Sequence, residues 1–149
     1  MLQITNLSKT YPNGVHALKD VTLNISNGMF GLLGPNGAGK STLMRTIATL
    51  QDADSGSIMF GNIDVFKQKQ ELRKVLGYLP QEFGVYPKVS AEEMLHYIAR
   101  LKGVANDKER KELVKALLEQ VNLYKHRNKA LGGYSGGRKQ SVGIAQTLI

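Results

Sequence analysis

The stretch that most constrains this chain is GPNGAGKS, at residues 34–41. It matches the phosphate-binding pattern GxxxxGK[ST] in full. Gly34, Gly37 and Gly39 let the backbone curl, so that successive N–H groups point inward at phosphate oxygens. An apolar run, MFGLLG (29–34), leads into the pattern and a helical pattern follows it. A glycine-rich turn that matched by accident would lack this strand-loop-helix context, so the sequence predicts a nucleotide-phosphate site.

The residue types of this loop each have a chemical reason. The helix that starts near Lys40 adds the positive end of its dipole to the site. The Lys40 ammonium can reach the β- and γ-phosphates, and the Ser41 hydroxyl can ligate Mg²⁺. We therefore assign nucleotide binding to the whole loop, which comprises Gly34, Pro35, Asn36, Gly37, Ala38, Gly39, Lys40, Ser41 and Thr42.

The first half of the chain is mainly of β type. Half-buried strands are predicted where apolar and polar residues alternate, and buried strands where short runs are wholly apolar. Pro12-Asn13-Gly14 marks a turn between the first two strands. The expected strands cover 2–11, 15–25, 29–34, 55–64 and 75–80, and the expected helices cover 43–50 and 67–75.

Residues 88–128 are expected to be helical. Ser90 with Glu93, and Asn106 with Glu109, each form a capping-box pattern ahead of an apolar periodicity. The second helix carries one apolar stripe. Its members are Leu113, Val114, Leu117, Leu118 and Val121. We expect this helical part to be an insertion into an α/β core.

Composition bounds the class of protein. The chain has 149 residues, 42% of them hydrophobic, no cysteine and a net charge of +8. Residues 100–139 hold eleven lysines and arginines against four acidic residues, which we interpret as a solvated helical face, so no nucleic-acid partner is expected. No run of about 18 apolar residues and no signal-peptide layout occurs, which predicts a soluble cytoplasmic protein.

Three motifs in order resemble the ATP-binding subunits of ABC transporters, over essentially the whole chain. GPNGAGKST (34–42) is similar to that family's Walker A segment, GYLPQEFGVYP (77–87) to its Q-loop region and YSGGRKQSVGIAQ (134–146) to its signature. Tyr11, 23 residues before Gly34, stands where the family has an adenine-stacking aromatic. Tyr134, Arg138 and Ser141 depart from the usual signature residues.

The resemblance implies roles for these positions. ATP and Mg²⁺ would be the cofactors, with Lys40 and Gln81 as catalytic residues and Ser41 and Gln81 at the metal. Tyr11 would stack on adenine, although it can also be an ordinary strand-end aromatic. Gln81 would contact Mg²⁺ and the attacking water, or else only serve its own loop.

The signature implies a second role for a glycine-rich turn. Ser135, Gly136 and Gly137 would bind the γ-phosphate of ATP held by the opposite subunit of a head-to-tail dimer. The residues allow it, because a hydroxyl and two glycines stand at the positive end of a helix. Alone, such a turn would more often be a helix cap.

The resemblance implies an α/β fold of the P-loop NTPase, ABC ATPase type, with an N-terminal antiparallel β part and an inserted helical subdomain. We expect a β-rich part with the P-loop core over 1–87, a helical subdomain over 88–134 and a signature helix over 135–149. A membrane-spanning permease subunit would be the partner, on the inner face of the cell membrane. GVYPKVSAEEML (84–95) looks exporter-like, of the drug or polysaccharide type.

The family's Walker B Asp and catalytic Glu lie beyond the signature helix, and no apolar run followed by Asp-Glu occurs in this chain. We therefore expect a chain truncated before Walker B, which binds ATP but does not hydrolyse it in the 149-residue form. The alternatives are a soluble ABC ATPase that acts on the ribosome or DNA, and an inactive fragment.

Overall fold

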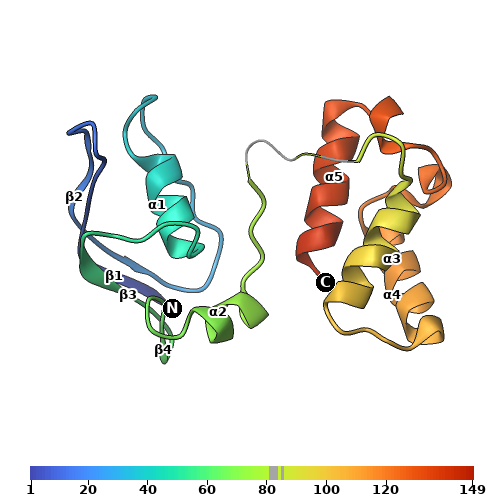
Figure 1. The fold of residues 1–149 in the computed structure, drawn as a ribbon, viewed down its shortest axis with the longest axis horizontal. Coiled ribbons are helices and arrows are strands. Elements are labelled where there is room, and N and C mark those ends of the chain that lie inside the picture. The colour runs from blue at the N-terminus through green and yellow to red at the C-terminus, as the bar shows by residue number, and fades with distance from the viewer. Residues whose placement is uncertain (81–83, 85) are drawn as a thin grey trace. The chain divides into compact units, whose positions relative to one another are not determined.

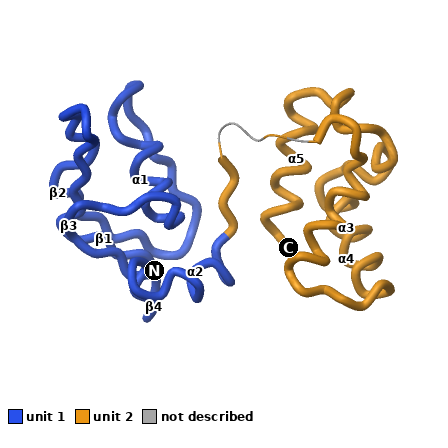
Figure 2. The backbone as a smooth tube through the Cα atoms, in the orientation of Figure 1, with its two compact units in different colours: residues 1–76 blue, residues 77–149 orange. Residues whose placement is uncertain are grey.

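A computed structural model describes residues 1–80, 84 and 86–149 of the chain (Figure 1). The backbone forms two compact units, Met1–Leu76 and Gly77–Ile149 (Figure 2). The first unit holds the β-sheet and two helices, and the second unit is helical. Each unit has a hydrophobic cluster of its own.

The first unit is built on an antiparallel sheet. β1 (Leu2–Thr10) and β2 (His16–Ile25) form the predicted hairpin, with the Tyr11 N–H donating to the Val15 carbonyl at 2.9 Å. β3 (Ser55–Phe60) pairs with the other edge of β1, and β4 (Ile63–Asp64) pairs with β3. The strand order is β2-β1-β3-β4, so β1 and β3 are the two inner strands (Figure 1). The expected N-terminal antiparallel β part is confirmed.

Two helices accompany this sheet. α1 (Lys40–Ile47) begins within the phosphate-loop motif, and α2 (Lys69–Val75) is the predicted short polar helix. Ile4 and Leu7 of β1, with a register shift in the strand between them, are buried together with one side chain from each helix. The buried cluster comprises Ile4, Leu7, Leu18, Leu43, Ile58, Val65 and Leu72. This core fixes the start of α1 against the sheet.

Two predicted strands are absent from the first unit and the start of the second. Residues 29–34 have no regular structure, and the side chains of Met29 and Leu33 are 100% and 93% exposed. Residues 76–80 likewise have no regular structure, and the expected strand start at Val75 is the last residue of α2. Both predictions were wrong. An apolar run favours burial, but a strand also needs a neighbouring strand to which its backbone can hydrogen-bond. Neither run has one among the described residues.

The second unit is a helical bundle. α3 (Ala91–Leu101), α4 (Asp107–Gln120) and α5 (Gly136–Thr147) pack together, with short 3₁₀ turns at Tyr124–His126 and Leu131–Gly133. Of the predicted stripe on α4, Val114, Leu117 and Leu118 are buried in the shared core, and the two flanking residues pack against it. The capping box of Ser90 and Glu93 is present in both directions. Of the second predicted capping box only half is seen among the described residues: the Asn106 side chain caps α4, and Glu109 does not return a bond to the Asn106 N–H.

Candidate nucleotide site

The phosphate loop is shaped by glycines that have a left-handed backbone. Gly37 and Gly39 both have φ of +84°, a region that costs other residues free energy. A side chain at Gly39 would also overlap the carbonyl oxygen of Ala17 in β2. Gly39 therefore lets the loop approach the sheet closely before α1 begins, whereas space is open at Gly37.

Lys40 folds back over the loop. Its ammonium nitrogen donates to the carbonyl oxygens of Gly34 at 2.6 Å and Pro35 at 2.7 Å. Lys40 is also the first residue of α1, whose first-turn N–H groups have no partner within the helix. A cation and the N–H groups of a helix start thus lie together at one loop. This donor set fits a polyanion such as the phosphates of a nucleotide.

The remaining loop residues divide into exposed and buried ones. Pro35, Asn36, Ala38 and Ser41 are exposed, and Ser41 is the second residue of α1. Thr42 is 8% exposed. Its hydroxyl lies 3.1 Å from the Tyr11 hydroxyl, so its side chain is already engaged within the protein.

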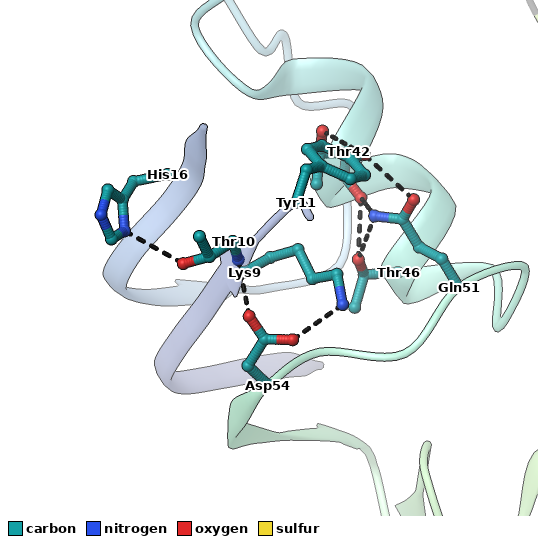
Figure 3. Close-up of polar contacts among 8 residues, drawn as sticks. All are labelled: Lys9, Thr10, Tyr11, His16, Thr42, Thr46, Gln51 and Asp54. Atoms are coloured by element: carbon teal, nitrogen blue, oxygen red, sulfur yellow. Dashed lines mark hydrogen bonds and ion pairs between the residues drawn. The ribbon is translucent and has the colours of Figure 1, made fainter. Parts of the chain in front are cut away.

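Tyr11 lies beside the first turn of α1, with its hydroxyl 3.1 Å from the Thr42 hydroxyl (Figure 3). Its backbone is held by the hairpin turn, with the N–H bonded to Val15 and the carbonyl accepting from Gly14 at 2.8 Å. Its hydroxyl donates to the Gln51 side-chain oxygen at 3.2 Å. Both ends of the residue are fixed, and the side chain is only partly buried.

The sequence analysis did not identify Gln51 and Asp54, which follow α1 and whose side chains hydrogen-bond to Tyr11, to α1 and to the end of β1. Gln51 bonds to Tyr11 and to α1, and Asp54 accepts from the Thr10 N–H at 2.6 Å (Figure 3). One sequence pattern could have indicated that α1 needs a polar partner. Thr42 and Thr46 stand four residues apart, hence on one face of α1, and buried hydroxyls need polar partners.

The signature turn lies in the second unit. Ser135 is the N-cap residue of α5, yet its hydroxyl makes no capping hydrogen bond to the helix. Ser135, Gly136 and Gly137 are exposed, and space is open where a side chain would start at each glycine. The turn therefore presents a serine hydroxyl and helix-terminal N–H groups to solvent.

The unusual signature residues have structural partners. The Tyr134 hydroxyl donates to the His126 carbonyl at 2.7 Å, and its ring is buried in the helical core. Arg138 approaches Nε2 of the same histidine at 3.2 Å. The positive charge on Arg138 is the main cause, and burial the second, of a His126 pKa below its ordinary value. The Ser141 hydroxyl donates to the Gly137 carbonyl at 3.2 Å. Sequence reasoning had assigned no role to His126.

Gln81 lies outside the described residues. Among the predicted residues of the first unit, the structure brings together the loop 34–42 and, through Thr42, Tyr11. Ser135, Gly136 and Gly137 belong to the second unit, and the structure groups them only with each other.

A glycine loop of this geometry at the start of a helix, beside a β-sheet, defines a P-loop nucleotide-binding domain. The family model described as ABC transporter matches residues 18–149. The chain therefore belongs to the ABC transporter family, as one of its ATP-binding domains, and the predicted fold class is confirmed.

Curated relatives share this family. The uncharacterized ABC transporter ATP-binding protein YxlF of Bacillus subtilis is 39% identical over 100% of this chain and 48% of its own length. The probable multidrug ABC transporter ATP-binding protein YbhF of Escherichia coli is 43% identical over 80% of this chain and 20% of its own. The spermidine/putrescine import ATP-binding protein PotA of Fusobacterium nucleatum is 36% identical over 99% of this chain and 39% of its own length. The chain spans about half the length, or less, of these relatives.

A solved structure agrees with the fold. The dimeric ATP-binding cassette MJ0796, in a post-hydrolysis state bound to ADP and Pi, aligns with a TM-score of 0.84 and 32% identity. The alignment covers 99% of this chain and 69% of that one. Among the residues that the structure of this chain describes, no helix is long and apolar enough to cross a membrane.

Proposed function

We propose that this chain is the ATP-binding part of a subunit that couples ATP hydrolysis to transport of a substrate across a membrane. The observation that carries the proposal is the Lys40 ammonium, held at 2.6 Å and 2.7 Å over two carbonyls of its own glycine loop. When ATP binds, Lys40 exchanges these neutral acceptors for the β- and γ-phosphate oxygens. Charge-assisted bonds of this kind are stronger than bonds to carbonyls. The N–H groups of the loop and of the first turn of α1 complete the cradle.

The other residues of the site have different roles toward the nucleotide and its metal ion. The Ser41 hydroxyl would hold Mg²⁺, whose charge would offset the negative charge of the phosphates. The resemblance gives Gln81 the role of contacting the same ion and the attacking water. The Tyr11 ring stacks on adenine in this proposal, because a flat aromatic face can stack on a base without base-specific hydrogen bonds.

Ser135, Gly136 and Gly137 act on a second subunit. They bind the γ-phosphate of the ATP held by that partner, in a head-to-tail dimer. Two observations support this role: the turn is exposed without a capping bond from its serine, and the MJ0796 cassette is dimeric. The two glycines leave room for phosphate to approach the backbone.

The subunit works on the cytoplasmic face of the cell membrane, peripherally attached to a membrane-spanning permease. We favour export, because the segment 84–95 looks exporter-like and YbhF is named a probable multidrug protein. PotA is named an import protein, so a transport assay in both directions decides the point.

A nucleic-acid partner is not expected. Several basic side chains of the helical unit already have acidic or aromatic partners. Arg110 and Lys111 both pair with Asp107 at 2.7 Å, and the Arg127 guanidinium lies 4.1 Å from the Tyr124 ring centroid. Paired charges attract a phosphate backbone less than free ones.

The dimer proposal is tested by sedimentation of the full-length protein with and without ATP. Ser135→Arg places a large side chain where the partner's phosphate must enter, so we expect ATP binding to the monomer to persist and ATP-driven dimerisation to be lost. Gln120→Arg, which adds the same charge at the exposed end of α4, should dimerise normally. A Ser135→Arg protein that dimerises like the control would contradict the proposal.

A further inference from the structure

Gln51 connects the Tyr11 ring to the helix that carries the phosphate loop. Its amide nitrogen donates to the Thr42 carbonyl at 3.1 Å and to the Thr46 hydroxyl at 3.0 Å, both on α1. Its amide oxygen accepts from the Tyr11 hydroxyl at 3.2 Å (Figure 3). One side chain thus spans the end of β1 and the first two turns of α1.

The chemistry of the partners fixes the direction of each bond. The Thr42 carbonyl can only accept, so the amide nitrogen of Gln51 must face it, which turns the amide oxygen toward Tyr11. The single proton of Tyr11 goes to that oxygen, and the Thr42 hydroxyl therefore donates to the tyrosine oxygen. Thr46 is fully buried and donates to the Thr42 carbonyl at 2.8 Å. The network has one consistent arrangement of protons.

A second contact from the same loop holds the backbone just before Tyr11. Asp54 accepts from the Thr10 N–H at 2.6 Å and from the Lys9 ammonium at 2.8 Å (Figure 3). Its own N–H donates to the Ser8 carbonyl at 2.9 Å. The hydrogen bond from Lys9, with that from Thr10, lowers the pKa of Asp54, so the carboxylate stays charged at neutral pH. The backbone at Tyr11 is therefore fixed, and only the ring rotamer depends on Gln51 and Thr42.

We infer that Gln51 is a positioning residue that sets the Tyr11 ring for the base of the nucleotide. The inference rests on the proposed function, in which Tyr11 contacts adenine. By tying the ring to α1, Gln51 fixes the spacing between the base contact and the phosphate loop. Without the hydrogen bond to Gln51, the Tyr11 ring samples more rotamers in the free protein. Binding of the base then restricts these rotamers, and this entropy cost weakens affinity. Binding of phosphates alone does not use the ring and is unaffected.

The test compares ATP with inorganic tripolyphosphate, both with Mg²⁺, by calorimetry on the full-length protein. Gln51→Leu should weaken ATP binding about 3- to 10-fold and leave tripolyphosphate binding unchanged. Tyr11→Phe keeps the ring and removes only the tethered hydroxyl, so it should give the same loss. Because both changes break one link, the double variant should be no weaker than either single variant, within about 2-fold. Gln70→Leu, at an exposed glutamine of α2, is the matched control.

The outcomes separate this inference from the proposed function. If Tyr11→Ala weakens ATP binding while Gln51→Leu and Tyr11→Phe do not, the inference is overturned and the base contact stands. If Tyr11→Ala has no effect on ATP binding, the base contact itself is wrong. Equal losses of ATP and tripolyphosphate affinity in Gln51→Leu would also overturn the inference, because Gln51 would then act on α1 and not on the ring.

Discussion

At the scale of single residues, His126 links the signature turn to the helical core. Its carbonyl holds the Tyr134 hydroxyl, and its ring faces the Arg138 guanidinium. A guanidinium only donates, so Nε2 accepts and the neutral imidazole carries its proton on Nδ1. Protonation of Nε2 would place two cations in contact. Arg138, followed by burial and then by Lys129 and Lys125, therefore lowers the pKa of His126.

This arrangement predicts a pH-dependent stability of the folded chain. Unfolded histidine binds a proton near pH 6.5, whereas the folded His126 resists protonation until the pH is lower. The unfolded state then binds more protons, so stability falls as the pH decreases from about 6.5 toward the folded pKa. We expect Tm to drop between pH 7.5 and pH 5.5, and to drop less in Arg138→Gln and in His126→Gln. An identical pH slope in all three proteins would refute this account.

Residues also show how far the site can be predicted from sequence. The loop 34–42 can be predicted because its chemistry requires fixed residue types at fixed spacings, whereas Tyr11 is assigned only by the resemblance to the family. Gln51 has no such signature. It matters because the fold brings a loop amide against two threonines of α1 and a tyrosine at the end of β1. Contacts between distant segments are set by tertiary structure, which local patterns do not encode.

At the scale of elements, caps and stripes are the most predictable features. The hairpin of β1 and β2, and the starts of α3 and α4, lie where turn and capping residues place them. The two apolar runs at 29–34 and 75–80 were the failures, because strand formation depends on a partner that no local pattern reveals. Local hydrogen bonds are thus predicted better than long-range ladders.

The capping box of α3 gives a test at this scale. The Glu93 N–H donates to the Ser90 hydroxyl at 3.2 Å, and the Ser90 N–H donates to the Glu93 carboxylate at 2.9 Å. Ser90→Ala should lower the free energy of unfolding by about 1 kcal/mol in urea titrations. Ser141→Ala, inside α5, should change it by less than about 0.5 kcal/mol. Equal effects of the two changes would show that the cap adds no specific stability.

At the scale of the whole molecule, binding and hydrolysis make different demands. The phosphate loop needs only the glycine backbone, Lys40 and the start of α1, all within the first unit. Hydrolysis also needs a positioned water, a general base and a closed dimer. No apolar run followed by Asp-Glu occurs in these 149 residues.

A polypeptide of residues 1–149 alone is therefore expected to bind ATP without turning it over. Positioning and base catalysis each contribute orders of magnitude to the rate, so their loss leaves a rate near background. Phosphate release with Mg-ATP measures this, with Lys40→Ala as the control for contaminating ATPases. Turnover that depends on Lys40 and approaches that of an intact subunit would show that a base lies within these residues.

The central claim is that the loop 34–42 binds ATP through the Lys40 ammonium. Calorimetric titration of the full-length protein with Mg-ATP, in the wild type and in Lys40→Ala, tests it most directly. Lys19→Ala, at an exposed lysine of β2, is the matched control. We predict that Lys40→Ala loses about 2–4 kcal/mol of binding free energy, roughly a 30- to 1,000-fold weaker Kd, while Lys19→Ala binds like the wild type. ATP affinity unchanged in Lys40→Ala would contradict the claim.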